Sequence, residues 1–556
     1  MYLKMKVKIP DVKGNIVINK KGLVLYETER KYNEEKKYNV PNRVSIGKVC
    51  DNGKMMIPTN RYSMYFYDEN LTQDIKDTYR SRCIRVGTYI VFREIIKQKG
   101  IFEILESIFE DYAGLIIDLA CYMIVDGNNA SQYYEDYAYN HLQFTKEYKI
   151  YSDSTISKVL NVISDNQRIS FLNQWNENRD VKDKIYITYD STNKNCQAGE
   201  IEIAEYGHAK DDDSKPIINM SLAYDHNNNE PLFYETYPGS IVDISQLQYM
   251  IDKAKGYGYK NIGIILDRGY FSRKNLEYIE ENGYDFIVMA KSTSKFVSGV
   301  IKEAVGTFEE ERKNRIGKWS IYGKTIRKEI FDERIRYVHI YYNEKRSAKE
   351  REEIEDKIYN LEKIYKRFIG TKNELIGAEK YFSIERDKKN IITVILPKNR
   401  IIQEEKKLCG YFTIITSKRM TATEAISLYK SRDVSEKIFR MDISYLGNRT
   451  YRVQSESSIK TKMMIEFISL IIRNEMYKCL DKAIEEPINR QNYMTVPATI
   501  KELEKIEMIK QGNGQYRLDC AITATQSKIL NAYGINPKTI VEKANYLSME
   551  LEKYGF

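Results

Sequence analysis

The chain has 556 residues, of which 42% are hydrophobic and 30% are charged. This composition supports packed cores and excludes wholesale disorder, and the length predicts about three or four domains. No apolar run reaches the ~18–20 residues that cross a bilayer, and the best candidate, Ala113–Val125, contains Asp118. Basic residues at the amino terminus are not followed by a continuous apolar segment, so we expect no secretory signal. We therefore expect a soluble, cytoplasmic protein.

Cysteine content and charge narrow the class of ligand. The seven cysteines are scattered, no Cys-x-x-Cys occurs, and four histidines cannot complete a zinc-ligand spacing. Any metal would therefore be held by carboxylates. The net charge is +9, and residues 1–50 alone hold 12 Lys and Arg against 5 Asp and Glu. This uneven charge favours a polyanionic partner, although charge runs are often only solvated surface.

The first third of the chain predicts two small domains. Residues 1–75 alternate in short apolar runs and contain the hairpin signal Asp51-Asn-Gly, which predicts a basic β module. From 76 to 180 the periodicity becomes helical, with the apolar segment Tyr112–Val125 and a helix that begins at Ser154. These helices predict a DNA-binding or dimerisation domain, and an ordinary scaffold explains them equally well.

Residues 181–295 change to strands that alternate with helices. Three strands come first and are followed by helix, strand, helix and strand, which predicts an α/β fold, α+β overall, with helices packed on a mixed sheet. The predicted strands are Ile185–Asp190, Ile217–Tyr224, Leu232–Thr236, Asn261–Asp267 and Phe286–Ala290, and the predicted helices are Ile244–Lys255 and Ser272–Asn282.

Residues 296–404 interrupt this pattern. They are rich in charge and combine two short strands, Ile335–Tyr342 and Ile391–Leu396, with the polar helix Ser347–Lys366, so we predict an inserted, β-rich subdomain. The α/β pattern returns over 405–480, and 481–556 is predicted to be a helical tail. The elements predicted after the insertion are a strand over Gly410–Thr416, a helix opened by a Thr421/Glu424 capping box, and the apolar helix Lys460–Leu480.

Two aspartates stand where predicted strands end. Asp190 closes Ile-Tyr-Ile-Thr-Tyr, and Asp267 closes Ile-Gly-Ile-Ile-Leu before the turn Arg-Gly-Tyr-Phe-Ser. Ligands of open α/β sheets bind beyond the carboxyl ends of strands, so an acid there is exposed and directed at the ligand. A single aspartate in this position is more often a turn or cap residue, but two on neighbouring strands favour a functional site.

A third carboxylate lies on the helix that begins at Thr421. At 100° per residue, Tyr429, Arg432, Glu436 and Arg440 fall within an arc of about 80° on one face. Such a face suits a metal-bound phosphodiester, because the carboxylate can bind a hard cation and arginine can donate bidentate hydrogen bonds to phosphate oxygens. An exposed face with i,i+4 ion pairs explains the spacing equally well.

These motifs, in this order, resemble the DDE transposases of bacterial insertion sequences. The resemblance rests on Tyr189-Asp190-Ser-Thr-Asn, Ile265-Leu-Asp267-Arg-Gly-Tyr-Phe-Ser and Tyr429-x2-Arg432-x3-Glu436. The group with a Tyr-x2-Arg-x3-Glu-x6-Lys signature and a β-rich insertion before the last acid is the most similar. Gly207-His-Ala-Lys-Asp and Pro238-Gly-Ser also fit, whereas Ile443 stands where the signature has Lys.

The resemblance implies an RNase-H-like core in which Asp190, Asp267 and Glu436 are both catalytic and metal-binding. Two Mg²⁺ ions per active site are expected, with Asp190 bridging them, and Mn²⁺ can substitute. Water would cut the phosphodiester at the transposon end, and the freed 3′-hydroxyl would then attack a second strand. The DNA-binding residues implied are Tyr429, Arg432, Arg440 and Arg268.

The partner implied is double-stranded DNA, as transposon ends with inverted repeats and as target. Two ends must be held together, so a homodimer is expected in the DNA complex, in the cytoplasm and on the nucleoid. Two alternatives stay open at this point. Ile443 motivates a catalytically inactive DNA-binding relative, and paired carboxylates would also serve a glycoside hydrolase.

Overall fold

The structure is a computed structural model of the chain. It describes residues 6–12, 15–33, 37–50, 53–59, 61–66, 80–177, 184–197, 201–241, 243–291, 294–331, 334–375, 377–433, 446–447, 450–484, 494–512 and 514–554. The chain divides into a terminal unit, formed by 1–93, 133–150 and 498–556, and a central unit, formed by 94–132 and 151–497. Among the described residues no helix has the length and apolar character needed to cross a bilayer.

The terminal unit begins with a five-stranded sheet. Its strands pair antiparallel in the order β1-β5-β4-β3-β2 around a small core that contains Val24, Ile46 and Met56. The strands are β1 (Val7–Lys8), β2 (Ile16–Ile18), β3 (Leu23–Asn33), β4 (Tyr38–Cys50) and β5 (Met55–Pro58). The predicted hairpin signal joins β4 to β5, and its residues 51 and 52 lie outside the described chain.

A second, three-stranded sheet of the terminal unit joins distant parts of the sequence. β6 (Cys83–Arg85) pairs with β19 (Glu507–Lys510), and β19 pairs with β20 (Tyr516–Leu518). The segment predicted as a helical tail therefore also contributes strands. The helices of this unit are α5 (Tyr134–Asn140), α16 (Val496–Leu503), α17 (Ala524–Ala532) and α18 (Ile540–Lys553), and α2 (Gly87–Lys99) begins in it.

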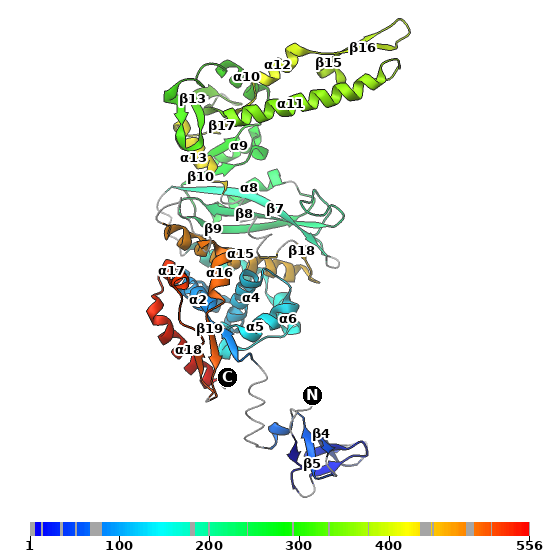
Figure 1. Cartoon of the computed structure of the whole chain (residues 1–556), viewed down its shortest axis with the longest axis vertical. Helices are drawn as coiled ribbons and strands as arrows, with labels where there is room; N and C mark the ends of the chain where they lie inside the picture. Colours follow the sequence, from blue (N-terminus) through cyan, green and yellow to red (C-terminus); the bar gives the residue numbers. More distant parts are fainter. Residues whose placement is uncertain are drawn as a thin grey trace. The chain divides into compact units, whose positions relative to one another are not determined.

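The central unit is built on one large mixed sheet (Figure 1). Its strands are β7 (Ile185–Cys196), β8 (Ile217–Asp225), β9 (Glu230–Pro238), β10 (Ile262–Leu266), β11 (Asp285–Met289), β12 (Arg315–Ile316), β13 (Ile321–Glu329), β14 (Ile335–Tyr342), β17 (Tyr411–Thr416) and β18 (Thr450–Tyr451). Their order is β12-β13-β14-β17-β11-β10-β7-β8-β9, and β18 pairs with β7. Because β8 is antiparallel to β7 and β9 while β10 and β11 run parallel to β7, the RNase-H-like mixed sheet is confirmed.

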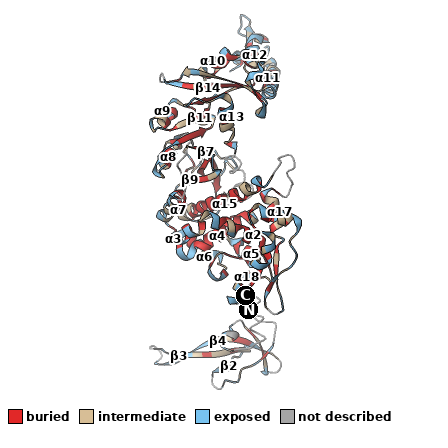
Figure 2. Ribbon diagram, turned by 90° about the vertical axis from the view of Figure 1, so that its left-hand side faces the viewer, coloured by how far each residue is buried: buried red, intermediate tan, exposed pale blue. Residues whose placement is uncertain are grey.

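Helices cover this sheet and form a second core beside it. The long helix α15 packs against β9, α4 and α6, and Figure 2 shows buried residues concentrated along α15 and α4. α4 is the apolar segment around Asp118, which therefore serves a protein core. The helices are α3 (Ile101–Phe109), α4 (Ala113–Asp126), α6 (Asp153–Val162), α7 (Asp165–Glu177), α8 (Asp243–Gly256), α9 (Arg273–Glu281), α10 (Lys295–Ala304), α13 (Ala422–Lys430) and α15 (Glu456–Lys482).

The segment 296–404 is divided between two structures. β13 and β14 join the large sheet through β17, because their alternating apolar residues continue its buried face. The later part, from α11 to α12, forms a separate cluster around Ile358, Phe382 and Ile392. That cluster is built from α11 (Glu344–Tyr365), β15 (Phe382–Arg386), β16 (Ile392–Pro397) and α12 (Asn399–Lys407).

A buried ion pair ties β7 to the helical core. The side chains of Lys194 on β7 and Glu466 on α15 are both 0% exposed and are in direct contact. The Tyr451 hydroxyl of β18 also donates to Glu466, and its ring lies 5.5 Å from the Lys194 ammonium. Neither charge has access to water, so each depends on the other for compensation.

Breaking this pair is expected to destabilise the central unit strongly. Lys194→Met leaves the Glu466 carboxylate buried without its countercharge, so the free energy of unfolding should fall by about 3–5 kcal/mol in urea titrations. The double variant Lys194→Met/Glu466→Leu removes both charges and should recover most of the loss. A double variant no more stable than the single one would contradict this account.

His339 is a second buried polar group, in the middle of β14. Its ring nitrogens contact Thr325 Oγ1 at 2.9 Å and Thr416 Oγ1 at 3.0 Å, so it joins β14 to both neighbouring strands. Burial lowers the pKa of His339 from 6.5 to about 4, because charging the ring there is unfavourable. The folded chain therefore holds this imidazole neutral at pH values where the unfolded chain protonates it.

This difference predicts a loss of stability in mild acid. As the pH falls from 6.5 toward 4, the unfolded state binds a proton that the folded state does not, and stability decreases. Between pH 7 and pH 5 the loss from His339 should be about 2 kcal/mol in urea unfolding. His339→Gln, whose amide can still reach both threonines, should lose this component. If the stability of the wild-type chain and of His339→Gln depended on pH equally, His339 would not be the group responsible for the loss.

Candidate active site

Asp190 lies inside β7, at the point where one edge of that strand becomes open. The strand was predicted to end at Asp190, which is wrong, because β7 continues to Cys196 with β8 beside it. On the other edge, β10 pairs only with residues 185–188, and β18 pairs only with residues 195 and 196. Asp190 therefore stands just past the end of β10.

The register between β7 and β10 brings the two aspartates together. Ile265 of β10 is the partner of Thr188 of β7 in a parallel ladder. Asp190 lies two residues beyond Thr188 within β7, and Asp267 lies two residues beyond Ile265, directly after the end of β10. Adjacent strands lie about 4.8 Å apart, so the two carboxylates start from neighbouring backbone positions. β7 and β10 are therefore neighbours in the sheet, with Asp190 inside the first and Asp267 directly after the second.

An aromatic contact holds the two acidic segments against each other. The rings of Tyr189 and Tyr270 are 5.9 Å apart in an edge-to-face arrangement, and both residues are buried. Tyr270 ends a short 3-10 helix, η6 (Arg268–Tyr270), for which Asp267 is the N-cap and accepts the Arg268 N–H at 2.7 Å. The predicted cap of the next helix is also present, because Ser272 accepts the Asn275 N–H. Asp267 is thus oriented by its own turn.

α13 and the turn that follows it bring a tyrosine and an arginine to Asp267. The Tyr429 hydroxyl donates to Asp267 Oδ1 at 3.3 Å, and Arg432 Nη1 lies 3.7 Å from Asp267 Oδ2. The predicted Thr421/Glu424 capping box opens this helix. The helix ends at Lys430, however, so the prediction of one continuous helix through residue 440 is wrong.

Tyr429 and Arg432 also differ from the predicted exposed stripe. The Tyr429 ring belongs to the core cluster with Ile265, Ile287 and Ile426, and it is 5% exposed. Arg432 is 9% exposed, and its guanidinium lies 5.7 Å from the Tyr429 ring. A large aromatic ring beside β10 and β11 is better buried than solvated, which the angular pattern alone could not show.

The remaining predicted residues are Arg268, Glu436 and Arg440. Arg268 is exposed, and no ion pair of its side chain occurs within the described residues. Glu436 and Arg440 lie outside the described residues, as does Ile443. No group of three or more potential metal ligands occurs in the part of the chain that the structure describes. The third carboxylate of the predicted set thus remains a prediction.

A loop that the sequence marked only as a motif lies beside Asp190. Lys210 Nζ donates to the Ser191 carbonyl at 2.7 Å, and the Lys210 N–H donates to Asn193 Oδ1 at 2.9 Å. The loop packs closely because Gly207 has no side chain. A Cβ at Gly207 would lie 2.1 Å from the Gly239 carbonyl oxygen. The motifs Gly207-His-Ala-Lys and Pro238-Gly-Ser are therefore in contact, and Lys210 adds a cation that spacing had not singled out.

Asp190 in β7 and Asp267 just after β10, with a tyrosine and an arginine in contact with Asp267, form a candidate site on an RNase-H-like sheet. The family model described as "Transposase DDE domain" matches residues 187–472, just over half of the chain. The chain belongs to this family, and it is a DDE-type DNA transposase, an enzyme of the polynucleotidyl transferase class that uses divalent metal ions. This membership excludes the glycoside hydrolase alternative.

Solved structures similar to this chain are also transposases. One is a piggyBac transposase synaptic complex with hairpin DNA, at 10% identity and a TM-score of 0.35, covering 88% of this chain and 84% of that one. Another is a Mos1 transposase paired-end complex with the left transposon end, at 11% identity and a TM-score of 0.14. That match covers 31% of this chain and 57% of the Mos1 chain. At these scores neither supports an argument about the site. No curated protein matches the sequence significantly.

The contact between α13 and Asp267 yields a stability prediction. Tyr429→Phe keeps the buried ring and loses one hydrogen bond, so the free energy of unfolding should fall by no more than about 1.5 kcal/mol. Tyr429→Ala leaves a cavity and should cost about 3–5 kcal/mol. Urea unfolding of both variants measures the difference. Similar losses in the two would mean that the hydroxyl, and not ring packing, fixes α13.

Proposed function

We propose that this transposase cuts DNA at the ends of a mobile element and joins the freed ends to target DNA, using Asp190, Asp267 and Glu436. The observation that supports the proposal is the parallel pairing of β7 with β10, because Asp190 and Asp267 each follow two residues after the paired residues Thr188 and Ile265. The matching order of motifs supports Glu436 as the third. Water attacks the phosphodiester, releasing a 3′-hydroxyl, and that hydroxyl then attacks a phosphodiester of the target strand.

The donor set fits a pair of Mg²⁺ ions. Carboxylate oxygens are hard donors, and Mg²⁺ takes few of them together with water and phosphate oxygens. The side chain of Asp267 is 40% exposed, so its oxygens are open to solvent and to a ligand. Bound metal would stabilise both the attacking and the leaving oxygen. Mn²⁺ has the same ligand preference and should substitute.

Residues around Asp267 support orientation of the carboxylate and of the DNA backbone. The Tyr429 hydroxyl and the Arg268 N–H both donate to Asp267 Oδ1, and Arg432 lies near Oδ2. The Arg268 side chain, which is exposed, is proposed to contact a phosphate near the scissile bond. Arg440 is proposed to do the same from the segment that carries Glu436.

Double-stranded DNA is the proposed substrate, as the inverted repeats of the element and as target. A homodimer in the DNA complex follows from the need to hold two ends at once, because each active site serves one end. An inactive DNA-binding relative is the second candidate, favoured only by Ile443 in place of the signature lysine. The two candidates differ in whether DNA is cut.

Replacing Asp267 separates these candidates. Asp267→Asn keeps the size and removes the charge that holds a cation, so nicking should fall by at least about 10²–10³-fold while duplex binding persists. The assay is Mg²⁺-dependent nicking of a supercoiled plasmid that carries the DNA bordering the coding sequence on both sides.

The matched control is Asp136→Asn, an exposed aspartate on α5 in the terminal unit, which should nick at the wild-type rate. Cleavage that survives Asp267→Asn would refute the assignment of the site. No cleavage by the unmodified chain with Mg²⁺ or Mn²⁺, together with retained DNA binding, would favour the inactive relative.

A further inference from the structure

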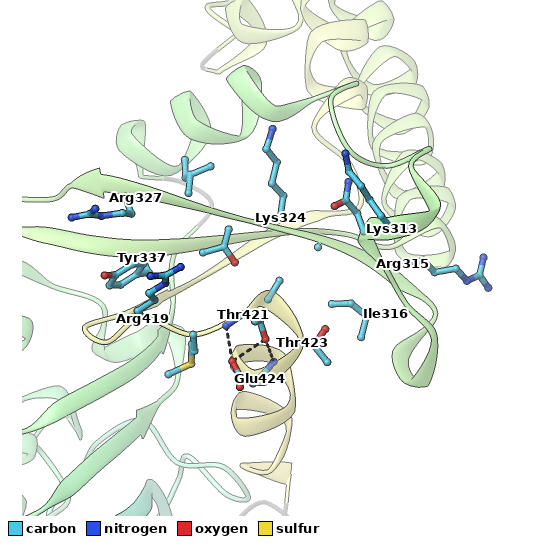
Figure 3. A pocket seen from close by; sticks show the side chains of 16 residues that line it. Lys313, Arg315, Ile316, Lys324, Arg327, Tyr337, Arg419, Thr421, Thr423 and Glu424 are labelled. Atoms are coloured by element: carbon cyan, nitrogen blue, oxygen red, sulfur yellow. Dashed lines mark hydrogen bonds between the residues drawn. The ribbon is translucent and has the colours of Figure 1, made fainter.

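A groove with strong positive charge lies at the opposite end of α13 from Asp267. It has a volume of about 860 Å³ and lies between β13, β14 and the first turn of α13 (Figure 3). Its charged lining consists of Lys313, Arg315, Lys324, Arg327, Arg419 and the single acid Glu424. The Glu424 carboxylate already accepts hydrogen bonds from the Thr421 N–H and hydroxyl at 2.7 and 2.9 Å, so it neutralises the groove little.

Two of these arginines share one end of the groove with a tyrosine. Arg327 of β13 is the cross-strand partner of Tyr337 of β14, and Figure 3 shows Arg327, Tyr337 and Arg419 at the same end. Arg327 and Arg419 are exposed, and neither has an ion pair with any carboxylate of the described chain. A tyrosine between two uncompensated guanidinium groups is suited to a ligand with several phosphate groups.

The shape of the groove is set by a close contact between α13 and the sheet. A Cβ on Gly323 would lie 3.1 Å from Ala422 Cβ and 2.9 Å from Ile316 Cδ1, so glycine is required for α13 to approach. The Tyr341 hydroxyl fixes the same contact by donating to the Ala422 carbonyl at 2.7 Å. Beyond this contact β12 pairs only with Ile321 and Tyr322, which leaves the outer edge of β13 open along the groove.

We propose that this groove binds the sugar-phosphate backbone of the DNA strand that passes through the active site. The helix between the two sites has nine residues, which corresponds to about 13 Å. At about 3.4 Å of rise per nucleotide, the groove would hold phosphates about four nucleotides from the bond that is cut. The inference takes its ligand from the proposed function, but it assigns a binding site separate from the carboxylates.

Salt-dependent binding tests this proposal without requiring cleavage. The probe is a fluorescent 30-base-pair duplex of arbitrary sequence in EDTA, with affinity measured by anisotropy over a range of KCl. Each lost phosphate contact should reduce the slope of log K against log salt by about 0.9. Arg327→Gln/Arg419→Gln should therefore reduce the slope by about 1.8 and weaken binding roughly 10- to 60-fold at 0.1 M salt.

Two matched variants make the result specific. Arg327→Lys/Arg419→Lys keeps both charges and should keep the slope near the wild-type value. Arg367→Gln/Lys407→Gln removes two exposed cations after α11 and on α12, and it should leave the slope unchanged. Thermal melting should be unaffected in all three variants, because every replaced side chain is exposed.

An unchanged slope in Arg327→Gln/Arg419→Gln would overturn the proposal. A loss as large in Arg367→Gln/Lys407→Gln would also overturn it, because the effect would then be one of net charge. A reduced slope in a chain that does not nick DNA would support the groove and refute only the proposed cleavage. If the chain nicks DNA normally but the slope is unchanged in Arg327→Gln/Arg419→Gln, the proposed cleavage would be supported and only the groove would be refuted.

Discussion

The parallel pairing of β7 with β10 is the constraint on which the site depends. Hydrogen bonding fixes Ile265 opposite Thr188, and two residues later come Asp190 within β7 and Asp267 just after β10. A shift of one residue in this register would turn one carboxylate to the other face of the sheet. The Tyr189–Tyr270 contact and the buried Lys194–Glu466 pair both act on this part of the sheet, one beside the acids and one further along β7. The core therefore stabilises the alignment that the chemistry needs.

α13 connects the catalytic sheet to the strands that follow it. Its capped end rests on β13 and β14, and its other end reaches Asp267 through Tyr429 and Arg432. Both the orientation of the acid and the shape of the basic groove thus depend on one short helix. Because that helix begins after β17, it brings residues from after the insertion to both Asp267 and the groove.

Much of this arrangement could be predicted from local patterns. The alternation of strands and helices over 181–295 predicted the order of β7 to β11 and the bounds of β8, β10 and β11 closely, whereas β7 continues six residues past its predicted end. Ser272 and Thr421 were predicted as caps from their own side-chain chemistry, and both are caps. The predicted pair of Asp190 and Asp267 required only that consecutive parallel strands be neighbours.

Long-range packing was not predictable in the same way. The strands β6 and β19 are three and four residues long and come from parts of the chain more than 400 residues apart, so no periodicity marks them. The burial of Tyr429 depends on β10 and β11, which a helical projection does not contain. Lys210 bonds to the Ser191 carbonyl from a loop that packs closely because Gly207 and Gly239 have no side chains. Each of these depends on tertiary contacts that a local window omits.

Iron-directed cleavage of the polypeptide tests most directly whether the two aspartates share a metal site. Fe²⁺ bound in place of Mg²⁺ generates oxidants that cut the backbone nearby when ascorbate and peroxide are added, and mass spectrometry locates the cuts. The account predicts cuts close to residues 190 and 267 in the same molecule, both lost in Asp190→Asn and both suppressed by excess Mg²⁺. Cuts at only one of the two segments, or cuts that persist in Asp190→Asn, would contradict it.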